Sequence, residues 1–354
     1  MSEARRRYAI LAPGTFAARS AKTAHGVIAY GSDETVAVID PAFAGRRVRD
    51  AVPYLRSDAP IVASVDEALA FAPTALLVGV APAGGALPPD WRASILRAID
   101  AGLEIVSGLH QFLGDDAQFA AAAARRGVRL WDVRTPPPPR LFEGSAYGVA
   151  ARVILTVGTD CAVGKMTASL ELSRAAREAG VAAAFVATGQ TGIAIAGRGA
   201  PIDRVIADFA SGAVEELVVT HAPGNDLLFV EGQGGINNAA FAPVTLALLY
   251  GAAPDALVLV HLAKRTHVED LGTPLLSLSR AIAVYEALCA TVKPARVVAV
   301  ALNTAGLDDA AAARALDDAR AETRLPCDDV VRNGPHALFG ALAPNVATKT
   351  RPLR

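Results

Sequence analysis

The residues with the clearest chemical potential form a short loop that ends in Gly164-Lys165. Residues 153–157 before the loop are apolar and mostly β-branched, and residues 168–176 after it have the pattern of a helix. In a loop between a strand and a helix, the backbone N–H groups point inward and form an anion-binding nest. The chain has only five lysines, so one at this position is unlikely to be chance. The pattern therefore predicts a phosphate-binding loop.

The loop departs from the usual G-x-x-x-x-G-K-[ST] spacing. Its first glycine is Gly158, one residue early, and Met166 stands where a hydroxyl residue normally follows the lysine. In phosphoryl transfer that hydroxyl holds Mg²⁺, and a thioether is a poor ligand for such a hard cation. Either Thr167 supplies the hydroxyl in a re-phased loop, or the loop binds a phosphorylated ligand without Mg-dependent phosphoryl transfer.

A second pattern delivers an acid to the end of an apolar strand. Residues 226–230 are followed by Glu231 and then by the run Gly232-Gln233-Gly234-Gly235. Glycines allow backbone to approach a ligand closely, and the acid has the position of a Walker B residue beside the phosphate-binding loop. The alternative is an acid that caps the next segment.

Polar residues also follow two later strands. Asn303 is a candidate contact for a nucleotide base, or it is a turn-forming asparagine. Lys264, Arg265 and His267 place positive charge on one loop, which suits a carboxylate or phosphate group or a solvated surface loop.

The first part of the chain alternates short apolar runs with helical stretches, which predicts a parallel, doubly wound sheet. The predicted strands are residues 27–30, 36–40, 61–63, 75–80, 104–107 and 128–131, and the predicted helices are residues 65–72, 90–101 and 117–126. The loops at 81–85 and 108–111 either line a small-molecule cleft or are tight turns. No G-x-G-x-x-G motif supports a dinucleotide cofactor.

Four prolines at 136–139 form a stiff, extended spacer and mark a domain boundary. We expect one domain at 1–135, a linker at 136–150 and a second domain at 151–354. In the second domain the predicted strands are residues 182–188, which exit through Gly189-Gln190-Thr191-Gly192, and residues 226–230, 256–262 and 296–302, with a helix at 205–217. The fold class is α/β, with two parallel sheets.

The composition narrows the function further. Of the 354 residues, 52% are hydrophobic and 19% charged, which fits two folded cores, and the net charge of −1 argues against nucleic-acid or membrane-surface binding. Three scattered cysteines fit a reducing compartment. The apolar run at the N-terminus ends at Pro13, too early for a signal sequence, so the expected location is cytoplasmic. The large apolar content favours a homo-oligomer.

With these motifs in place, the chain resembles one known family over nearly its whole length. The resemblance rests on residues 36–40, 81–85, 158–167, 189–192 and 231–235, and the string Gly-Thr-Asp-Cys-Ala-Val-Gly-Lys-Met-Thr is specific to it. The family was first defined as a domain of unknown function, with a Rossmann-like N-terminal domain and a P-loop C-terminal domain. Members are described as D-glutamate N-acetyltransferases that use acetyl-CoA. The second domain is also similar to dethiobiotin synthetase and MinD-like proteins.

The resemblance implies that the loop binds the pyrophosphate of coenzyme A, with Lys165 as the charge partner and no metal required. The implied cofactor-binding residues are Gly158, Thr159, Asp160, Cys161, Ala162, Val163, Gly164, Lys165, Met166, Thr167 and Asn303. Beside the resemblance, we predict Glu231, Asp160, Lys165 and His267 as catalytic residues and Gln190, Arg198, Gln233, Gly234 and Arg265 as substrate-binding residues.

Several roles stay open at this point. The group that removes the ammonium proton is Asp160, Glu231, His261 or His267, and Cys161 is either an acyl-enzyme nucleophile or a small structural residue. The alternative function is an ATP- and Mg-dependent kinase or ligase of the dethiobiotin synthetase type. A non-enzymatic, nucleotide-responsive module is the third class, and the lack of an amphipathic tail at 351–354 argues against its membrane-bound version.

Overall fold

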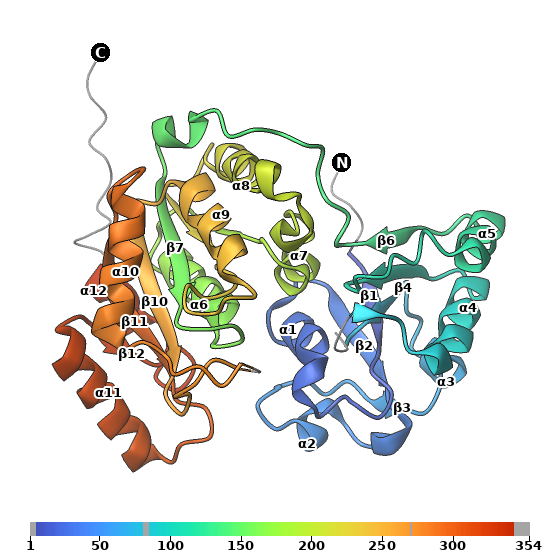
Figure 1. Cartoon of the computed structure of the whole chain (residues 1–354). Helices are drawn as coiled ribbons and strands as arrows, with labels where there is room; N and C mark the ends of the chain where they lie inside the picture. Colours follow the sequence, from blue (N-terminus) through green and yellow to red (C-terminus); the bar gives the residue numbers. More distant parts are fainter. Residues whose placement is uncertain (1–4, 81–84, 270, 343–354) are drawn as a thin grey trace. The chain divides into compact units, whose positions relative to one another are not determined.

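The computed structural model describes residues 5–80, 85–269 and 271–342. Contacts divide the chain into two compact units (Figure 1). The N-terminal unit consists of residues 1–135 together with 190–201, and the P-loop unit consists of residues 136–189 and 202–354. The segment 190–201 therefore leaves the P-loop unit, completes the N-terminal unit and returns.

The N-terminal unit is built on a 6-stranded parallel sheet in the order β3-β2-β1-β4-β5-β6. Its strands are β1 Arg7–Leu11, β2 Glu34–Ile39, β3 Ile61–Val62, β4 Ala75–Val78, β5 Glu104–Ser107 and β6 Leu130–Asp132. Its helices are α1 Lys22–Tyr30, α2 Val48–Ala51, α3 Val65–Leu69, α4 Arg92–Asp100, α5 Ala117–Arg126 and α7 Gln190–Ala196, with 3-10 turns at Arg19–Ala21, Pro41–Phe43 and Pro89–Trp91. The predicted parallel, doubly wound sheet is confirmed.

Two local predictions in this unit are wrong. Residues 27–30 are the last turn of α1 and not a strand. Four apolar residues do not distinguish a strand from a helix by periodicity, and α1 buries Thr23, Ala24, Gly26 and Val27, which recur with helical spacing. The sequence prediction also missed β1, because three arginines precede its apolar run and Pro13 follows it.

The carboxyl edge of this sheet is closed by its own loops. Asp40 follows β2 and is fully buried, and its carboxylate accepts N–H bonds from Gly14 (2.8 Å), Phe16 (3.0 Å) and Ala42 (2.9 Å). Dinucleotide-binding sheets use an acid near this position for a ribose hydroxyl. Here the acid fastens the loop after β1, which agrees with the missing glycine motif.

Two sequence features fall wholly or partly outside the described residues. The first is the loop 81–85, of which only Gly85 is described, and its carbonyl accepts N–H bonds from His110 (2.9 Å) and Gln111 (3.2 Å). The second is the tail 351–354.

Of the residues predicted as the exit of a strand at 189–192, Gly189 lies in the turn after β8, whereas residues 190–192 begin α7. Most of this helix is buried in the N-terminal unit, where Thr191 Oγ1 lies 3.0 Å from Thr23 Oγ1. Gln190 packs so closely on Gly108 that a Cβ there would lie 3.0 Å from Gln190 Cγ. The helix α7 therefore packs against α1 and against the loop after β5.

The P-loop unit has a second 6-stranded parallel sheet, in the order β12-β11-β10-β7-β9-β8. Its strands are β7 Arg152–Gly158, β8 Ala183–Val186, β9 Leu227–Val230, β10 Ala256–Leu262, β11 Arg296–Asn303 and β12 Cys327–Asp328. Its helices are α6 Lys165–Glu178, α8 Ala207–His221, α9 Ala242–Ala252, α10 Leu278–Ala290, α11 Asp309–Thr323 and α12 His336–Leu342, with 3-10 turns at Ser145–Gly148 and Ile202–Arg204. The strand that delivers Glu231, β9, is hydrogen-bonded to β7, as the Walker B interpretation expects.

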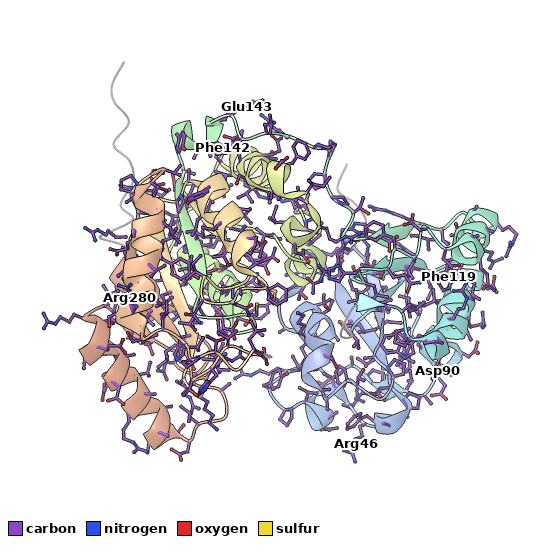
Figure 2. The ribbon with its side chains drawn as sticks, viewed as in Figure 1. Arg46, Asp90, Phe119, Phe142, Glu143 and Arg280 are labelled. Carbon is purple, nitrogen blue, oxygen red and sulfur yellow. The ribbon has the colours of Figure 1, made fainter. Side chains whose placement is uncertain are left out.

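The proline-rich linker is anchored on α8 of the P-loop unit (Figure 2). The buried carboxylate of Glu215 accepts N–H bonds from Glu143 (2.7 Å) and Ala146 (3.1 Å). Gly212 allows the contact, since a Cβ there would lie 2.0 Å from the carbonyl oxygen of Arg140. Across the described ranges, no helix combines the length and the apolar character needed to cross a lipid bilayer.

Candidate functional site

The candidate site is the loop between β7 and α6. The chain reaches it through Gly158, and it turns into α6 through two residues with positive φ, Ala162 (51°) and Gly164 (113°). Gly164 is the N-cap of α6 and has no side chain to satisfy the first N–H groups of the helix. Such groups carry the positive end of the helix dipole, so they suit an anion.

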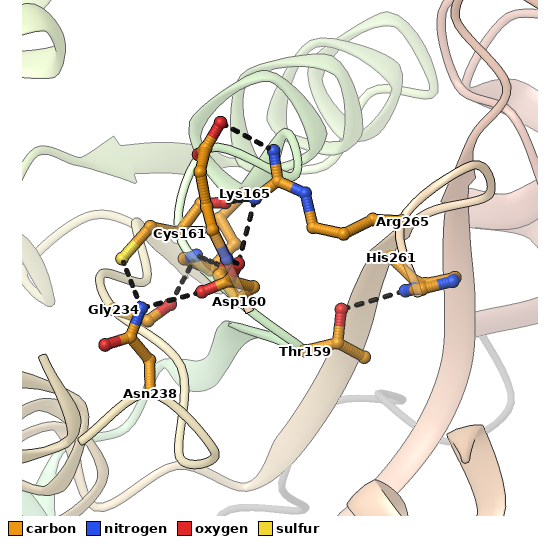
Figure 3. A network of polar contacts seen from close by, with 9 residues as sticks. Thr159, Asp160, Cys161, Lys165, Gly234, Asn238, His261 and Arg265 are labelled. Carbon is orange, nitrogen blue, oxygen red and sulfur yellow. Dashed lines mark hydrogen bonds and ion pairs between the residues drawn. The ribbon is translucent and has the colours of Figure 1, made fainter. Parts of the chain in front are cut away.

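Lys165 lies inside this loop and is only 6% exposed (Figure 3). Its ammonium donates to the carbonyl oxygens of Asp160 (2.7 Å) and Gly234 (2.6 Å). Burial lowers the pKa of Lys165 to about 8. A Cβ on Gly158 would lie 2.9 Å from Lys165 Nζ, so the early glycine is the residue that makes room for the lysine.

Asp160 is a fully buried residue of the loop, and its carboxylate bonds the loop to two neighbouring segments. Its Oδ1 accepts from Asn238 Nδ2 (2.9 Å), and its Oδ2 accepts from Arg265 Nη1 (3.0 Å) and from Glu269 N–H (2.8 Å). Burial by itself raises the pKa of Asp160, but these hydrogen bonds, with that of Asn238 foremost, outweigh it and leave the pKa below its usual value. The carboxylate is therefore held as an anion that joins three loops.

The guanidinium of Arg265 is directed at the phosphate-binding loop. Its side chain is 8% exposed, and Nη1 also donates to the carbonyl oxygen of Cys161 (2.7 Å), while Nη2 pairs with Glu269 (3.2 Å). The neighbouring Lys264 is exposed and donates to the carbonyl of Gly306. Of these two cationic side chains, Arg265 is buried and bonded to the phosphate-binding loop, whereas Lys264 is exposed.

The two candidate histidines have different surroundings. His261, near the end of β10, has Nδ1 2.9 Å from Thr159 Oγ1 in the loop, and burial lowers the pKa of His261 to about 4. His267 is exposed and its Nδ1 lies 2.9 Å from Thr266 Oγ1. The structure brings His261 to the loop, whereas His267 is not among the residues of the network in Figure 3.

The glycine run after β9 packs directly on the loop. A Cβ on Gly232 would lie 1.7 Å from the carbonyl oxygen of Thr156, and a Cβ on Gly235 would lie 2.7 Å from Asp160 Cα. The hydroxyl of Thr156 also accepts the N–H of Gly232 (3.0 Å). Any side chain at these glycines would push the two segments apart, so the run serves close backbone packing within the protein.

Glu231 holds the turn between β8 and α7. Its Oε2 accepts N–H bonds from Thr188 (3.0 Å) and Gly189 (3.1 Å), and its carbonyl accepts from Thr188 Oγ1 (2.7 Å). Gln233 adds a bond from Nε2 to the carbonyl of Thr188 (2.6 Å). Gly189 is covalently joined to Gln190, so this turn is also where the chain enters the N-terminal unit.

Asn303 contacts the loop from the end of β11. Its Nδ2 donates to the carbonyl oxygen of Val163 (3.1 Å), and its Oδ1 accepts from the N–H of Ala305 (3.0 Å). Asn303 is therefore the turn-forming asparagine of the second alternative and also touches the loop, while its contact with a nucleotide base stays a prediction. Cys161, Met166 and Thr167 are partly exposed in and after the loop.

The predicted substrate-binding residues divide between the two units. Gln233, Gly234 and Arg265 lie at the loop, and all three are engaged with protein groups. Gln190 and Arg198 belong to the N-terminal unit, where Gln190 is buried and Arg198 is exposed.

Sequence reasoning missed two residues that brace the site. Tyr285 on α10 is fully buried, donates to the carbonyl of Gly158 (2.6 Å) and accepts the N–H of Ile236 (3.1 Å). Burial raises the pKa of Tyr285, so its proton stays available for donation. The other is Asn238, the partner of Asp160. Asn238 lies three residues after the glycine run, which is a usable signal, but nothing in the spacing identifies Tyr285.

Comparison with known proteins places the chain in a family. Residues 140–339 match a family model described as Domain of unknown function (DUF1611_C) P-loop domain, and residues 41–136 match the DUF1611_N Rossmann-like domain. The chain belongs to the DUF1611 family. Both DUF1611 models agree with the two sheets described above.

One solved member of the DUF1611 family shares the architecture, and two named relatives share much of the sequence. The crystal structure of a DUF1611 family protein from Anabaena variabilis is 39% identical, covers 96% of this chain and 100% of its own, and has a TM-score of 0.92. A protein from Tritonibacter scottomollicae named D-glutamate N-acetyltransferase is 38% identical, over 79% of this chain and 84% of that protein. A protein of the same name from Pseudoalteromonas is 36% identical over the same shares.

Proposed function

We propose that this protein is an N-acetyltransferase that moves an acetyl group from acetyl-CoA to the amine of an acidic amino acid, with D-glutamate as the expected acceptor. The names of two relatives at 36–38% identity support the reaction class. The observation that carries the cofactor assignment is the buried ammonium of Lys165 at the start of α6, followed by Met166 where Mg²⁺-binding loops have a hydroxyl.

The loop has the donors that a pyrophosphate needs. An ammonium has three N–H donors, and Lys165 uses two of them on carbonyl oxygens. The third donor and the first N–H groups of α6 are the groups that we assign to the pyrophosphate of coenzyme A. A phosphate next to the ammonium also offsets the cost of burying it.

We assign bracing and orienting roles to the two carboxylates of this network. Asp160 and Glu231 each already accept at least two N–H bonds, and those to Asp160 favour its charged form and lower its basicity. Glu231 orients the turn at 188–189. In coenzyme A the thioester is separated from the pyrophosphate by the whole pantetheine arm, so we infer that acetyl transfer takes place away from this network.

The function is tested by the release of free coenzyme A. Purified protein is mixed with acetyl-CoA and a panel of D- and L-amino acids, and thiol release is followed alongside the acetylated product by mass spectrometry. We expect release with acidic amino acids, highest for D-glutamate, and none with neutral or basic ones. If no acidic amino acid releases coenzyme A, the proposal is wrong.

The second candidate is an ATP- and Mg-dependent kinase or ligase, because the loop lies in a P-loop unit and Thr167 is partly exposed beside it. Calorimetric titration with ATP–Mg²⁺ and with acetyl-CoA separates the two functions. Binding of ATP that requires Mg²⁺, without binding of acetyl-CoA, would reverse the ranking.

A further inference from the structure

The N-terminal unit contains a recess along β6, which is the edge strand of its sheet (Figure 1). We call it the β6 recess: it is lined by residues 129–133 and 135 on one side and by Ile193 and residues 197–199 on the other. Its volume is about 490 Å³. This lies in the range of small-molecule sites, and all of its lining belongs to the N-terminal unit.

One wall of the β6 recess carries an arginine, Arg198, that makes no polar contact of its own within the described residues. Arg198 is exposed and forms no hydrogen bond or ion pair with any residue in the described ranges. It is flanked by Gly197 (φ 72°) and Gly199 (φ 148°), both in backbone conformations that other residues rarely adopt. Gly197 also ends α7 through an N–H bond to the carbonyl of Ile193 (2.8 Å). The loop thus carries a single long side chain, and that side chain is a cation.

The opposite wall adds further donors. Arg129 O and Val133 N are bonded to β5, and residues of a parallel strand face alternate sides, so the N–H groups of Leu130 and Asp132 face the outer edge. The guanidinium of Arg129 stacks on Trp131 at 5.3 Å from the ring centroid. The guanidinium of Arg129 is also paired with Glu104 (3.7 Å), so the groups that favour an anion here are the two edge N–H groups and Arg198.

One acid, Asp132, lines the β6 recess, and its carboxylate is bonded to backbone N–H groups. Asp132 is 8% exposed, and its two carboxylate oxygens accept the N–H groups of Leu113 (2.9 Å) and Gly114 (2.9 Å). The side chains of Ile193 and Trp131 provide apolar surface beside the cations. A recess with the exposed cation of Arg198, edge N–H donors and some apolar surface suits a small molecule that has carboxylates and a few methylene groups.

We propose that the β6 recess binds the carboxylates of the acetyl acceptor, a dicarboxylic amino acid, with Arg198 as the principal anchor. Naming the ligand as the acceptor rests on the proposed function. The proposal also gives a role to segment 190–201, which belongs to the N-terminal unit and forms one wall of the β6 recess. Because the thioester of bound acetyl-CoA is distant from the pyrophosphate, an acceptor site outside the phosphate-binding loop is what this chemistry requires.

Calorimetric titration of D-glutamate into the full-length protein, without acetyl-CoA, tests the proposal independently of turnover. We expect Arg198→Ala to weaken binding about ten- to a hundredfold, the usual effect of losing a charged hydrogen-bond pair. Arg198→Lys should bind with intermediate affinity, because it keeps the charge and loses the forked geometry. The matched control is Arg125→Ala, which removes an exposed arginine of α5 outside the recess and should leave affinity unchanged.

Fluorescence locates the bound molecule. The chain has two tryptophans, Trp91 and Trp131, so Trp91→Phe leaves Trp131 in the β6 recess as the sole reporter. We expect D-glutamate to change its emission in a saturable way and glutarate to compete, while inorganic phosphate at equal concentration does not.

The outcomes separate this inference from the proposed function. Arg198-dependent binding of D-glutamate without coenzyme A release would support the recess and refute the transferase. Coenzyme A release with an unchanged acceptor KM in Arg198→Ala would refute the recess and support the transferase. A loss of acetyl-CoA affinity in Arg198→Ala, with D-glutamate binding intact, would assign the arginine to a phosphate of the cofactor and overturn the inference.

Discussion

Asp40 and Asp160 occupy comparable places in the two sheets, and they do different work. Both follow a parallel strand, both are fully buried and both have two or more N–H donors on the carboxylate. The donors of Asp40 are all main-chain groups of nearby loops in its own unit. Those of Asp160 include the side chains of Arg265 and Asn238, from loops more than 70 residues away in sequence.

The difference is the reason that we assign a phosphate site to only one of the two edges. In the N-terminal unit the carbonyl of Gly79 takes the N–H of Ala24 (2.8 Å), so the loops at this edge satisfy one another. In the P-loop unit the loop is braced from the outside, by Arg265, Asn303 and Tyr285. Its own helix N–H groups therefore stay available. Both units have a parallel sheet, so we assign the phosphate site on the external bracing of the loop.

The largest expected effect comes from neutralising the two aspartates in turn. Asp160→Asn should lower the free energy of unfolding by about 3–5 kcal/mol, because it removes the fully buried counter-charge of the Arg265 guanidinium and leaves only the more exposed Glu269. Asp40→Asn should lower the free energy of unfolding by about 1–3 kcal/mol, since only a main-chain N–H loses its acceptor. Urea denaturation measures both. Equal losses would contradict the comparison, as would a loss of acetyl-CoA affinity in Asp40→Asn.

The next largest effect is expected from removing the hydroxyl of Tyr285, with the buried Tyr8 as the comparison. Tyr285→Phe leaves the carbonyl of Gly158 and the N–H of Ile236 without their partner, so unfolding should become easier by about 1–3 kcal/mol and the KM for acetyl-CoA should rise. Tyr8→Phe in the N-terminal unit is the matched control. The Tyr8 hydroxyl is buried without a hydrogen-bond partner among the described residues, so its removal should change stability by less than about 0.5 kcal/mol. If Tyr285→Phe changes neither the free energy of unfolding nor the KM for acetyl-CoA, the loop needs no outside brace.

The smallest expected effect is a pH dependence that only the P-loop unit should produce. In free protein Lys165 loses its proton above its pKa of about 8, whereas a bound phosphate keeps the lysine charged. Binding of acetyl-CoA therefore takes up a proton above pH 8 and should weaken by up to about tenfold per pH unit.

The control for the pH dependence is Lys165→Ala, whose weaker binding should stay constant over the same range. A wild-type affinity that does not change between about pH 7 and 9.5 would show that Lys165 does not meet the phosphate.

Much of the fold and part of the site follow from the sequence alone. The strands at 104–107 and 256–262 and the helix at 117–126 are long or regular enough to have the predicted bounds. The helix α1 was mistaken for a strand because its visible part is four apolar residues, and α7 was missed because its glycine resembles a strand exit. Local pattern does not show which unit a segment packs in.

The parts of the site that lie within one sequence motif were predictable, and the contacts between residues distant in sequence were not. Gly158, Gly164 and Lys165 lie within one motif, and their roles follow from its spacing. Arg265 was expected to hold a substrate carboxylate, and the structure shows its guanidinium on Asp160. That pairing joins residues 105 positions apart, which only the folded sheet brings together.

The most direct test of the central claim is the affinity for acetyl-CoA of Lys165→Ala, measured by calorimetry at pH 7. We expect binding about ten- to a hundredfold weaker than in the wild type, since a charge-assisted contact is lost while the helix N–H groups remain. Lys264→Ala, which removes an exposed lysine from the loop after β10, should bind like the wild type. A wild-type affinity in Lys165→Ala, with its fold intact by circular dichroism, would contradict the account, because the Gly-Lys loop would then not be the phosphate site.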